Sequence, residues 1–322
     1  MGFEGGTRGD SRVSSGPART RLPSRVQAEL ALLGNALIWG VTFTTVKNAL
    51  ADASPILFVA VRFTLAGVAL LLLYHRKLDR RMVLPGSIVG LLLFAGYAFQ
   101  TTGLRFTTPS KSAFITGLTI PMVPLLTSLV YKRRPRPAEL AGVLSATIGM
   151  GLMTLQDVHL RVNPGDVLTV LCAAAFAGHI VVLGYFSNWA TAKGMGFESL
   201  AVYQIVSAAA FALLSFGWLD SPRWHMSNRL AIALAITGLL ATALAFSVQT
   251  WAQRYTTPTR TALIYSLEPV FAWVFSWIVT GELLSRKATL GAVLILAGIL
   301  LVELKRTTAG QHLIVSVTTP EV

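Results

Sequence analysis

The sequence predicts an all-α membrane protein of about ten transmembrane helices, arranged as two inverted five-helix repeats. Only 13% of the residues are charged and 53% are apolar, whereas soluble domains carry about 25% charged residues. The apolar residues gather in blocks near the ~20 residues that span a hydrocarbon core. A motif also recurs in both halves. The ten blocks are 29–47, 55–74, 84–104, 109–130, 138–155, 166–186, 198–219, 229–251, 259–280 and 287–303.

Short polar segments separate these blocks, such as YKRRPRP at 131–137 and DSPR at 220–223. The ten blocks use most of the 322 residues, so no room remains for a soluble domain. Residues 1–28 are rich in Gly, Ser, Arg and Pro without an apolar stretch. They predict a disordered basic tail rather than a signal peptide. Residues 306–322 are expected to form a C-terminal tail.

The net charge of +13 is distributed unevenly between the two sides of the predicted topology. With the N-terminus in the cytoplasm, 18 of the 27 Lys and Arg residues fall on the cytoplasmic side and 8 on the other side. This asymmetry follows the positive-inside rule and predicts that both termini are cytoplasmic. Basic loops of this kind contact lipid headgroups. Membrane lipids are therefore the expected partners, and nucleic acid is not.

An internal repeat relates the two halves. Residues 100–114 read QTTGLRFTTPSKSAF, and residues 249–263 read QTWAQRYTTPTRTAL. The shift of 149 residues also pairs two later sets of glycines, Gly142 with Gly291 and Gly149 with Gly298. These glycines predict close packing between the fifth and tenth helices, or a dimer contact.

The repeat unit is about five helices, at 29–155 and 166–305. An odd number of crossings inverts the second copy in the membrane, which is a signature of transporters. With a small gap, Pro121 in the fourth helix comes opposite Pro269 in the ninth. Together with Pro124, these prolines are predicted to break their helices and free backbone groups to line a cavity.

Four stretches carry a family resemblance: ALIWGVTF at 36–43, AVRFTLAGVALLL at 60–72, SKSAFITGLTIPMVPLL at 110–126, and PTRTALIYSLEPVFAWVFSWIVTGELLSRKATLGAVLILAGILLV at 258–302. The sequence resembles EamA-type members of the drug/metabolite transporter superfamily over about residues 29–305. One departure is Lys132-Arg133-Arg134, where such repeats often carry Gly-Glu. The resemblance implies a secondary carrier, often an exporter of amino acids, metabolites or drugs, and it implies no particular substrate.

Glu268 is the only acidic residue deep within a predicted helix. An ionisable side chain at the bilayer centre costs about 2.5–3.5 kcal/mol on insertion scales. Because burial favours the neutral form of a carboxyl group, Glu268 is a candidate for proton coupling. Alternatively, it satisfies backbone donors freed by Pro269 or pairs with a cation. Arg62, in the second helix, is predicted to bind an anionic group, to pair with Glu268, or to snorkel to the interface.

Uncharged polar and aromatic side chains within the helices suggest a cavity for amino acids or aromatic compounds. Each of them alone also suits an ordinary hydrogen bond between helices. The candidates for this cavity are Asn35, Trp39, Gln100, His179, Gln204, Gln249 and Tyr265.

The remaining chemistry is limited. Cys172 is the only cysteine and the five histidines form no HxxxH pair, so no metal or cofactor is expected.

The leading hypothesis is a secondary transporter in the bacterial inner membrane that exports a small organic solute and exchanges protons. A lipid-intermediate or nucleotide-sugar carrier falls in the same class. The alternatives are an intramembrane enzyme acting on a lipid-linked substrate and a non-transporting receptor or scaffold. The sequence leaves the oligomeric state open.

Overall fold

The computed structural model describes residues 25–40, 42–132, 134–154, 163–280 and 285–307. Within them the chain is helical, and one isolated bridge between Ala53 and Trp224 is the only β-type pairing. The predicted all-α class is therefore confirmed. Most of the two predicted tails lies outside the described residues.

Each predicted block coincides with one helix or with a broken helix. In the first half these are α1 (Arg25–Gly40) and α2 (Thr42–Ala49), α3 (Pro55–Tyr74), α4 (Val83–Gly103), α5 (Pro109–Thr116) and α6 (Thr119–Val130), and α7 (Pro137–Thr154). In the second half they are α8 (Pro164–Ala192), α9 (Glu198–Leu219), α10 (Asn228–Ala235), the π-helical η3 (Ile236–Leu244) and α11 (Ala245–Ala252), α12 (Pro258–Tyr265) and α13 (Glu268–Thr280), and α14 (Arg286–Thr307). Two short 3-10 turns, η1 (His75–Lys77) and η2 (Arg80–Met82), join α3 to α4.

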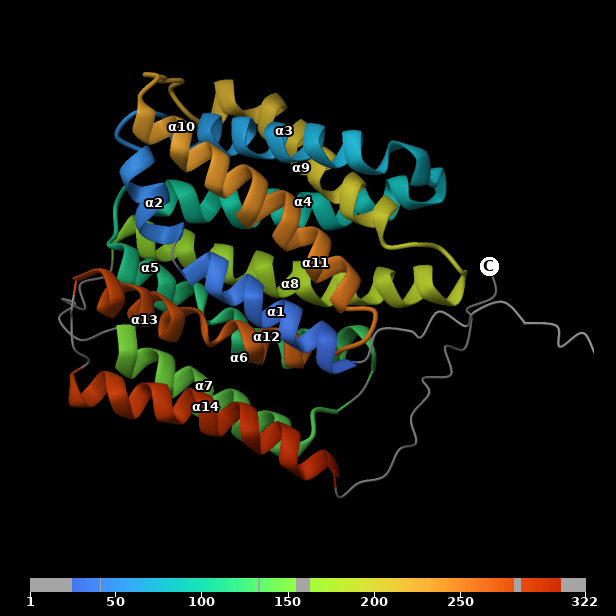
Figure 1. The fold of residues 1–322 in the computed structure, drawn as a ribbon, viewed down its shortest axis with the longest axis vertical. Coiled ribbons are helices and arrows are strands. Elements are labelled where there is room, and N and C mark those ends of the chain that lie inside the picture. Colours follow the sequence, from blue (N-terminus) through green and yellow to red (C-terminus); the bar gives the residue numbers. More distant parts are fainter. Residues whose placement is uncertain (1–24, 41, 133, 155–162, 281–284, 308–322) are drawn as a thin grey trace, which may run out of the picture.

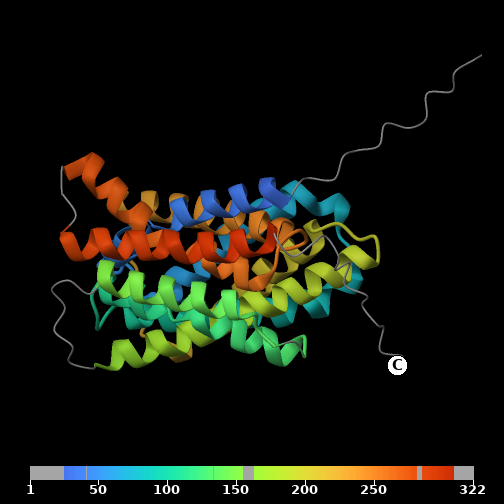
Figure 2. The same ribbon diagram turned by 90° about the horizontal axis from the view of Figure 1, so that it is seen from below.

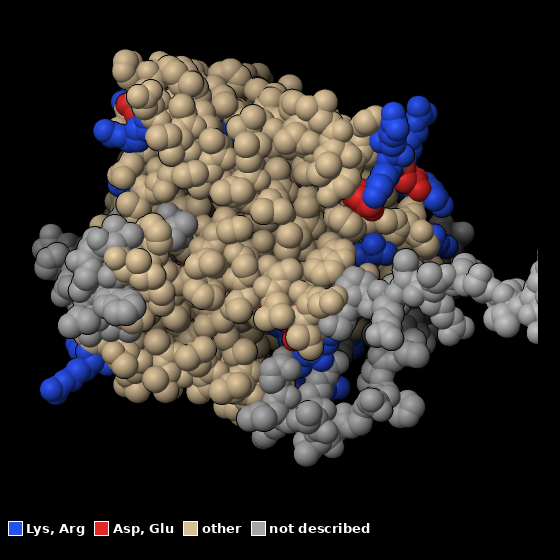
Figure 3. Space-filling view, viewed as in Figure 1, with Lys and Arg blue, Asp and Glu red and all other residues tan. Residues whose placement is uncertain are grey.

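Seven helices of the described chain are long and apolar enough to cross a membrane, and Pro137–Met153 is a shorter apolar helix. Their surface is apolar as well: Leu72, Leu129, Leu214 and Trp218 are each at least 74% exposed. On the face shown in Figure 3, Lys, Arg, Asp and Glu gather at two opposite ends, and a broad uncharged belt lies between them. Lipid is the medium that suits such a belt.

The helices run alongside one another in a block (Figures 1 and 2). Helix α1 begins and α14 ends at the same end of this block, which we call the terminal end. Helix α12 also begins there. Helices α5 and α8 begin at the opposite end (Figure 1). The two ends therefore correspond to the two faces of the membrane.

Helices α7 and α14 pack antiparallel through the predicted glycines. A Cβ built on Gly142 would lie 2.6 Å from the carbonyl oxygen of Gly298, and a Cβ on Gly149 would lie 2.5 Å from that of Gly291. Only glycine permits backbones to approach this closely. The prediction of packing between the fifth and tenth helices is confirmed.

Two helices break at positions 149 residues apart. Helix α5 ends at Thr116 and α12 ends at Tyr265, while α6 begins at Thr119 and α13 at Glu268. Pro121 and Pro269 fall in the first turn after each break, where the missing N–H has no helical partner in any case. Pro124 does not break its helix, since α6 continues through it to Val130. That part of the prediction is wrong, because one missing hydrogen bond inside a packed helix does not end it.

Candidate functional site

The π-helical segment η3 organises the centre of the site. The carbonyl oxygen of Ala241 accepts hydrogen bonds from Trp39 Nε1 at 2.9 Å and from Arg62 at 3.4 Å. Just beyond η3, the carbonyl of Ala245 accepts from Asn35 Nδ2 at 2.7 Å. A π-helix closes i→i+5 rather than i→i+4 bonds, and such segments are frequent at functional sites. Here it presents carbonyl groups to α1 and α3.

Arg62 is held by neutral groups. Its Nε donates to Thr242 Oγ1 at 2.7 Å, and its terminal nitrogen donates to the Tyr97 hydroxyl at 3.2 Å. The guanidinium also stacks over the Tyr97 ring, 4.4 Å from the ring centroid. It is 3% exposed and has no acidic partner within 4 Å among the described residues. Both the predicted pairing with Glu268 and the predicted snorkelling are therefore wrong, because polar groups from η3 and α4 already surround the cation.

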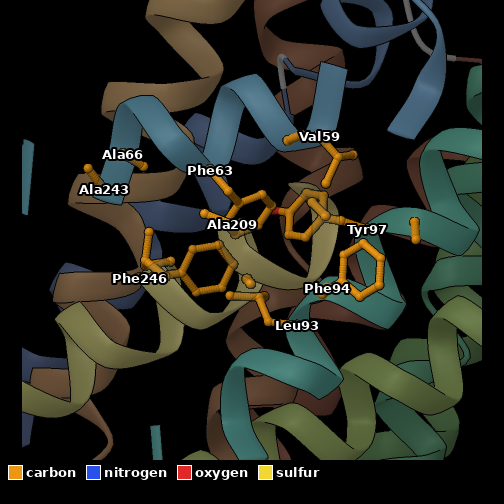
Figure 4. Close-up of a cluster of buried hydrophobic side chains, with 14 of the residues drawn as sticks. Val59, Phe63, Ala66, Leu93, Phe94, Tyr97, Ala209, Ala243 and Phe246 are labelled. Atoms are coloured by element: carbon orange, nitrogen blue, oxygen red, sulfur yellow. The ribbon is translucent and has the colours of Figure 1, made fainter. Parts of the chain in front are cut away.

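Aromatic rings pack around this centre. Trp39 contacts Tyr265 and Phe246 edge-on or tilted, with ring centroids 4.8 and 5.4 Å apart. Tyr97 contacts Phe176 with centroids 5.2 Å apart. Figure 4 shows Tyr97 on α4 and Phe246 on α11 turned into the same buried cluster as Phe63 of α3. We call Trp39, Tyr97, Phe176, Phe246 and Tyr265 the aromatic cluster.

Glu268 lies beside the aromatic cluster at the first position of α13. Its carbonyl oxygen packs against Gly40 of α1, where an added Cβ would come within 2.7 Å. Its half-buried carboxylate is close enough to Tyr97, Tyr265 and Cys172 to interact with them electrostatically. Among the described residues, no Lys, Arg or His lies within 4 Å of it. The carboxylate thus lies near aromatic and neutral groups and away from basic side chains of the described residues.

The other predicted site residues form separate hydrogen-bonded groups. His179 and Gln204 bond at 3.0 Å, and Gln204 donates to Thr250 at 2.7 Å. Both side chains are fully buried, and the His179 ring touches the aromatic cluster only through Phe246. Gln249 donates to Gln253 at 3.3 Å on the same helix turn. These contacts account for His179 and Gln204 as structural groups, whereas the buried Oε1 of Gln249 has no hydrogen-bond partner among the described residues.

Gln100 lies nearer to the site. It donates to Thr116 at the helix break, and Thr116 in turn contacts the Cys172 sulfur at 3.9 Å. The structure therefore brings Asn35, Trp39, Tyr265 and Glu268 together, with Arg62 and Gln100 at the margins. Tyr97, Phe176, Phe246 and Thr242 belong to the site and were not predicted. The sequence signal available for these residues was Tyr97, a tyrosine within the apolar block 84–104.

These features define a polytopic membrane protein with a half-buried carboxylate at a helix break, beside an aromatic cluster. The chain belongs to the EamA-like transporter family, whose model matches residues 26–155 and again residues 163–304. The family resemblance inferred from the sequence is confirmed.

Proteins similar to this chain in sequence are also named as transporters. An uncharacterized transporter of Archaeoglobus fulgidus is 34% identical over 282 residues, 87% of each chain. The uncharacterized transporter YoaV of Bacillus subtilis is 23% identical and covers 85% of this chain and 96% of its own. The uncharacterized inner membrane transporter YedA of Escherichia coli K12 is 28% identical over 146 residues, 44% of this chain and 47% of its own. A solved crystal structure at 19% identity has a TM-score of 0.73 and covers 89% of this chain and 100% of its own, which supports the fold alone.

Proposed function

We propose that this protein is a secondary transporter that exports a small organic solute across the bacterial inner membrane by alternating access. Membership of a transporter family supports the handling of a small-molecule solute. Nothing in the family match or in the relatives favours an intramembrane enzyme. The name of YedA supports the inner membrane as the location.

We propose further that residues 29–155 and 166–305 are inverted repeats. The family model matches two ranges of similar extent. The glycine contacts support a two-fold relation, because Gly142 faces Gly298 while its repeat equivalent Gly291 faces Gly149. This exchange of partners is what a two-fold axis between α7 and α14 produces. Repeats of this kind give a carrier two related conformations open to opposite faces.

Glu268 is the proposed coupling residue, and its lack of a charged partner among the described residues is the observation that carries the proposal. A half-buried carboxylate within a membrane bundle, without a cation at ion-pair distance, is suited to bind a proton or a cationic group of the solute. Solute export is coupled to proton movement if Glu268 exchanges a bound proton for the cationic group of the solute. Glu268 lies at the break from α12 to α13, with its carbonyl oxygen packed on α1, so a change in helix angle there alters the access of its carboxylate to water.

The aromatic cluster is the proposed solute site. Aromatic faces bind apolar and cationic groups, and Trp39, Tyr265 and Glu268 are each half-buried. Asn35 and Gln100 supply hydrogen-bonding groups at its edge. His179 and Gln204 support the helices behind it. Several helices therefore contribute to one site.

The test compares Glu268→Gln with Glu198→Gln in proteoliposomes. Glu198 pairs with Lys77 at 2.8 Å near a helix end, so its loss removes a carboxylate away from the site. Proton movement is recorded with a trapped pH-sensitive dye while amino acids, nucleosides and quaternary amines are added in turn. Labelling of Glu268 by dicyclohexylcarbodiimide, followed by mass spectrometry, reports its protonation without a known solute.

We expect Glu268→Gln to fold normally and to lose solute-driven proton flux, and Glu198→Gln to retain it. Carbodiimide labelling of Glu268 should decrease as the pH rises, because the reagent attacks the protonated carboxyl. Normal solute-driven proton flux in Glu268→Gln, or labelling independent of pH, would show that Glu268 is not the coupling residue.

A further inference from the structure

Two ion pairs of the same design lie at opposite ends of the bundle. Lys111 Nζ lies 2.5 Å from Asp166 Oδ2, with side-chain exposures of 11% and 7%. Arg260 Nη1 lies 2.7 Å from Glu29 Oε1, with exposures of 5% and 21%. We call these the α5–α8 pair and the α1–α12 pair.

The basic members of the pairs come from the repeated motif, Thr-Thr-Pro-Ser-Lys at 107–111 and Thr-Thr-Pro-Thr-Arg at 256–260. In each copy the second threonine caps the helix: Thr108 accepts from the Lys111 amide and Thr257 from the Arg260 amide. The first threonine donates to the same carboxylate that the basic residue binds. Thr107 bonds to Asp166 at 3.0 Å, and Thr256 bonds to Glu29 at 3.3 Å. The two copies of the motif are thus alike both in sequence and in the contacts that they make.

Both pairs join the two halves of the chain. In the α5–α8 pair the cation comes from the first half and the acid from the second, and in the α1–α12 pair the roles are reversed. Helices α5 and α8 begin at one end of the bundle, while α1 and α12 begin at the terminal end (Figure 1). Each membrane face therefore has one ion pair of this repeated design. Lys77–Glu198 and Arg105–Asp220 also join the halves, but their basic side chains are exposed and they lack the Thr-Thr-Pro motif.

The basic residue of each pair also lies on a broken helix that leads to the site. Arg260 lies in the first turn of α12, which ends at Tyr265, three residues before Glu268. Lys111 lies in the first turn of α5, which ends at Thr116, and Thr116 contacts Gln100 and Cys172. Releasing a pair frees the outer end of such a short helix. Because both ions become hydrated when an aqueous face opens, separation there is reversible, in contrast to a pair broken inside hydrocarbon.

We propose that the α5–α8 pair and the α1–α12 pair are the two alternating closures of the transport path, each of which must break for its own face to open. This inference rests on the proposed transport function. Both pairs are formed in the present structure. A conformation open at one face retains the pair at the other face, so weakening one pair shifts the balance toward the conformation open on that side.

The test measures access to a reporter cysteine from each face. In a Cys172→Ala background, Thr116→Cys is labelled with a membrane-impermeant trimethylammonium methanethiosulfonate in right-side-out and inside-out vesicles, without solute or pH gradient. Asp166→Asn removes the α5–α8 pair, and Glu29→Gln removes the α1–α12 pair together with the Arg25–Glu29 pair within α1. The matched control is Glu198→Gln, which breaks the exposed Lys77–Glu198 pair between the same halves.

We expect Asp166→Asn to raise labelling from the face where α5 begins and to lower it from the terminal face. Glu29→Gln should do the reverse, and Glu198→Gln should change neither. The ratio of the two rates should shift about tenfold, equivalent to ~1.4 kcal/mol in the conformational balance. Unchanged ratios, or increased labelling from both faces in both variants, would overturn the proposal.

Lys111→Met provides a second approach to the same pair. Asp166 then remains to cap α8 through its bonds with Asn163, so this variant carries the test if Asp166→Asn does not fold. Lys111→Met should give the same ratio of labelling rates from the two faces as Asp166→Asn. The double variant that combines these two changes should give that ratio too, because one contact can be lost only once. Additive shifts would overturn the proposal. Since labelling needs no solute, these outcomes do not depend on whether Glu268 couples transport.

Discussion

Replacing Gly149 by alanine tests how tightly α7 and α14 pack. The added Cβ would lie 2.5 Å from the Gly291 carbonyl oxygen and 2.9 Å from the Ile295 amide nitrogen, whereas ordinary contacts begin at 3.4 Å. Both neighbours are backbone atoms, so the helices must separate locally by roughly 0.9 Å and lose contacts on both sides. Overpacking of this kind costs about 1–3 kcal/mol, offset by about 0.5–1 kcal/mol because alanine favours a helix. The expected net loss of stability is about 1–2 kcal/mol.

The matched controls are Gly34→Ala in α1 and Gly217→Ala in α9, where an added Cβ meets nothing within 4 Å. Buried Cys172 provides the assay, because a fluorogenic thiol reagent reacts with it only on unfolding. Gly149→Ala should melt below the wild type in detergent, and the controls should not. Adding Gly291→Ala should cost less than the sum of the two single changes, since both push the same backbones apart. A midpoint for Gly149→Ala equal to that of the controls would refute the reasoning.

Two further predictions concern topology and Arg62. An impermeant maleimide should label Asp10→Cys and Gly310→Cys in the Cys172→Ala background only from the cytoplasmic face, as the excess of basic residues on that side predicts; labelling of either from outside would contradict it. Arg62→Lys keeps the charge but loses the planar fork that bonds Thr242 and Tyr97, so in the Cys172 unfolding assay we expect a loss of about 1–3 kcal/mol. A lysine variant as stable as the wild type would show that these bonds are dispensable.

Helix positions could be predicted well because they depend on local signals. The apolar blocks located each helix or helix pair, and the Thr-Thr-Pro motif marked helix starts that the structure shows capped by Thr108 and Thr257. The glycine spacing of seven residues correctly indicated one face of α7 packed on one face of α14. Such signals operate within one or two turns of a helix, so a single sequence contains them.

Partners across the fold could not be predicted in this way. Lys111 and Arg260 were recognised as repeat equivalents, but their acids, Asp166 and Glu29, lie 137 rather than 149 residues apart and escaped the alignment. Arg62 was expected to pair with the only deep carboxylate. Its actual partners depend on how α3 is rotated toward η3 and α4, and on a π-helical stretch that the apolar sequence ITGLLATAL does not reveal.

The two halves are alike where they are joined and differ where the site lies. The motifs, the ion pairs and the glycine contacts recur in both, whereas the helix after the break begins with Thr119 in the first half and with Glu268 in the second. Thr116 likewise corresponds to Tyr265, and the regular helix α4 corresponds to the helix that contains η3. Symmetric contacts suit a motion that must run in both directions, because each face then opens and closes by the same means. A solute needs one binding site rather than two, so its charged and aromatic groups are free to differ between the halves. By this reasoning, substitutions at the ion pairs should alter which face is open, and substitutions around Glu268 should alter what is carried.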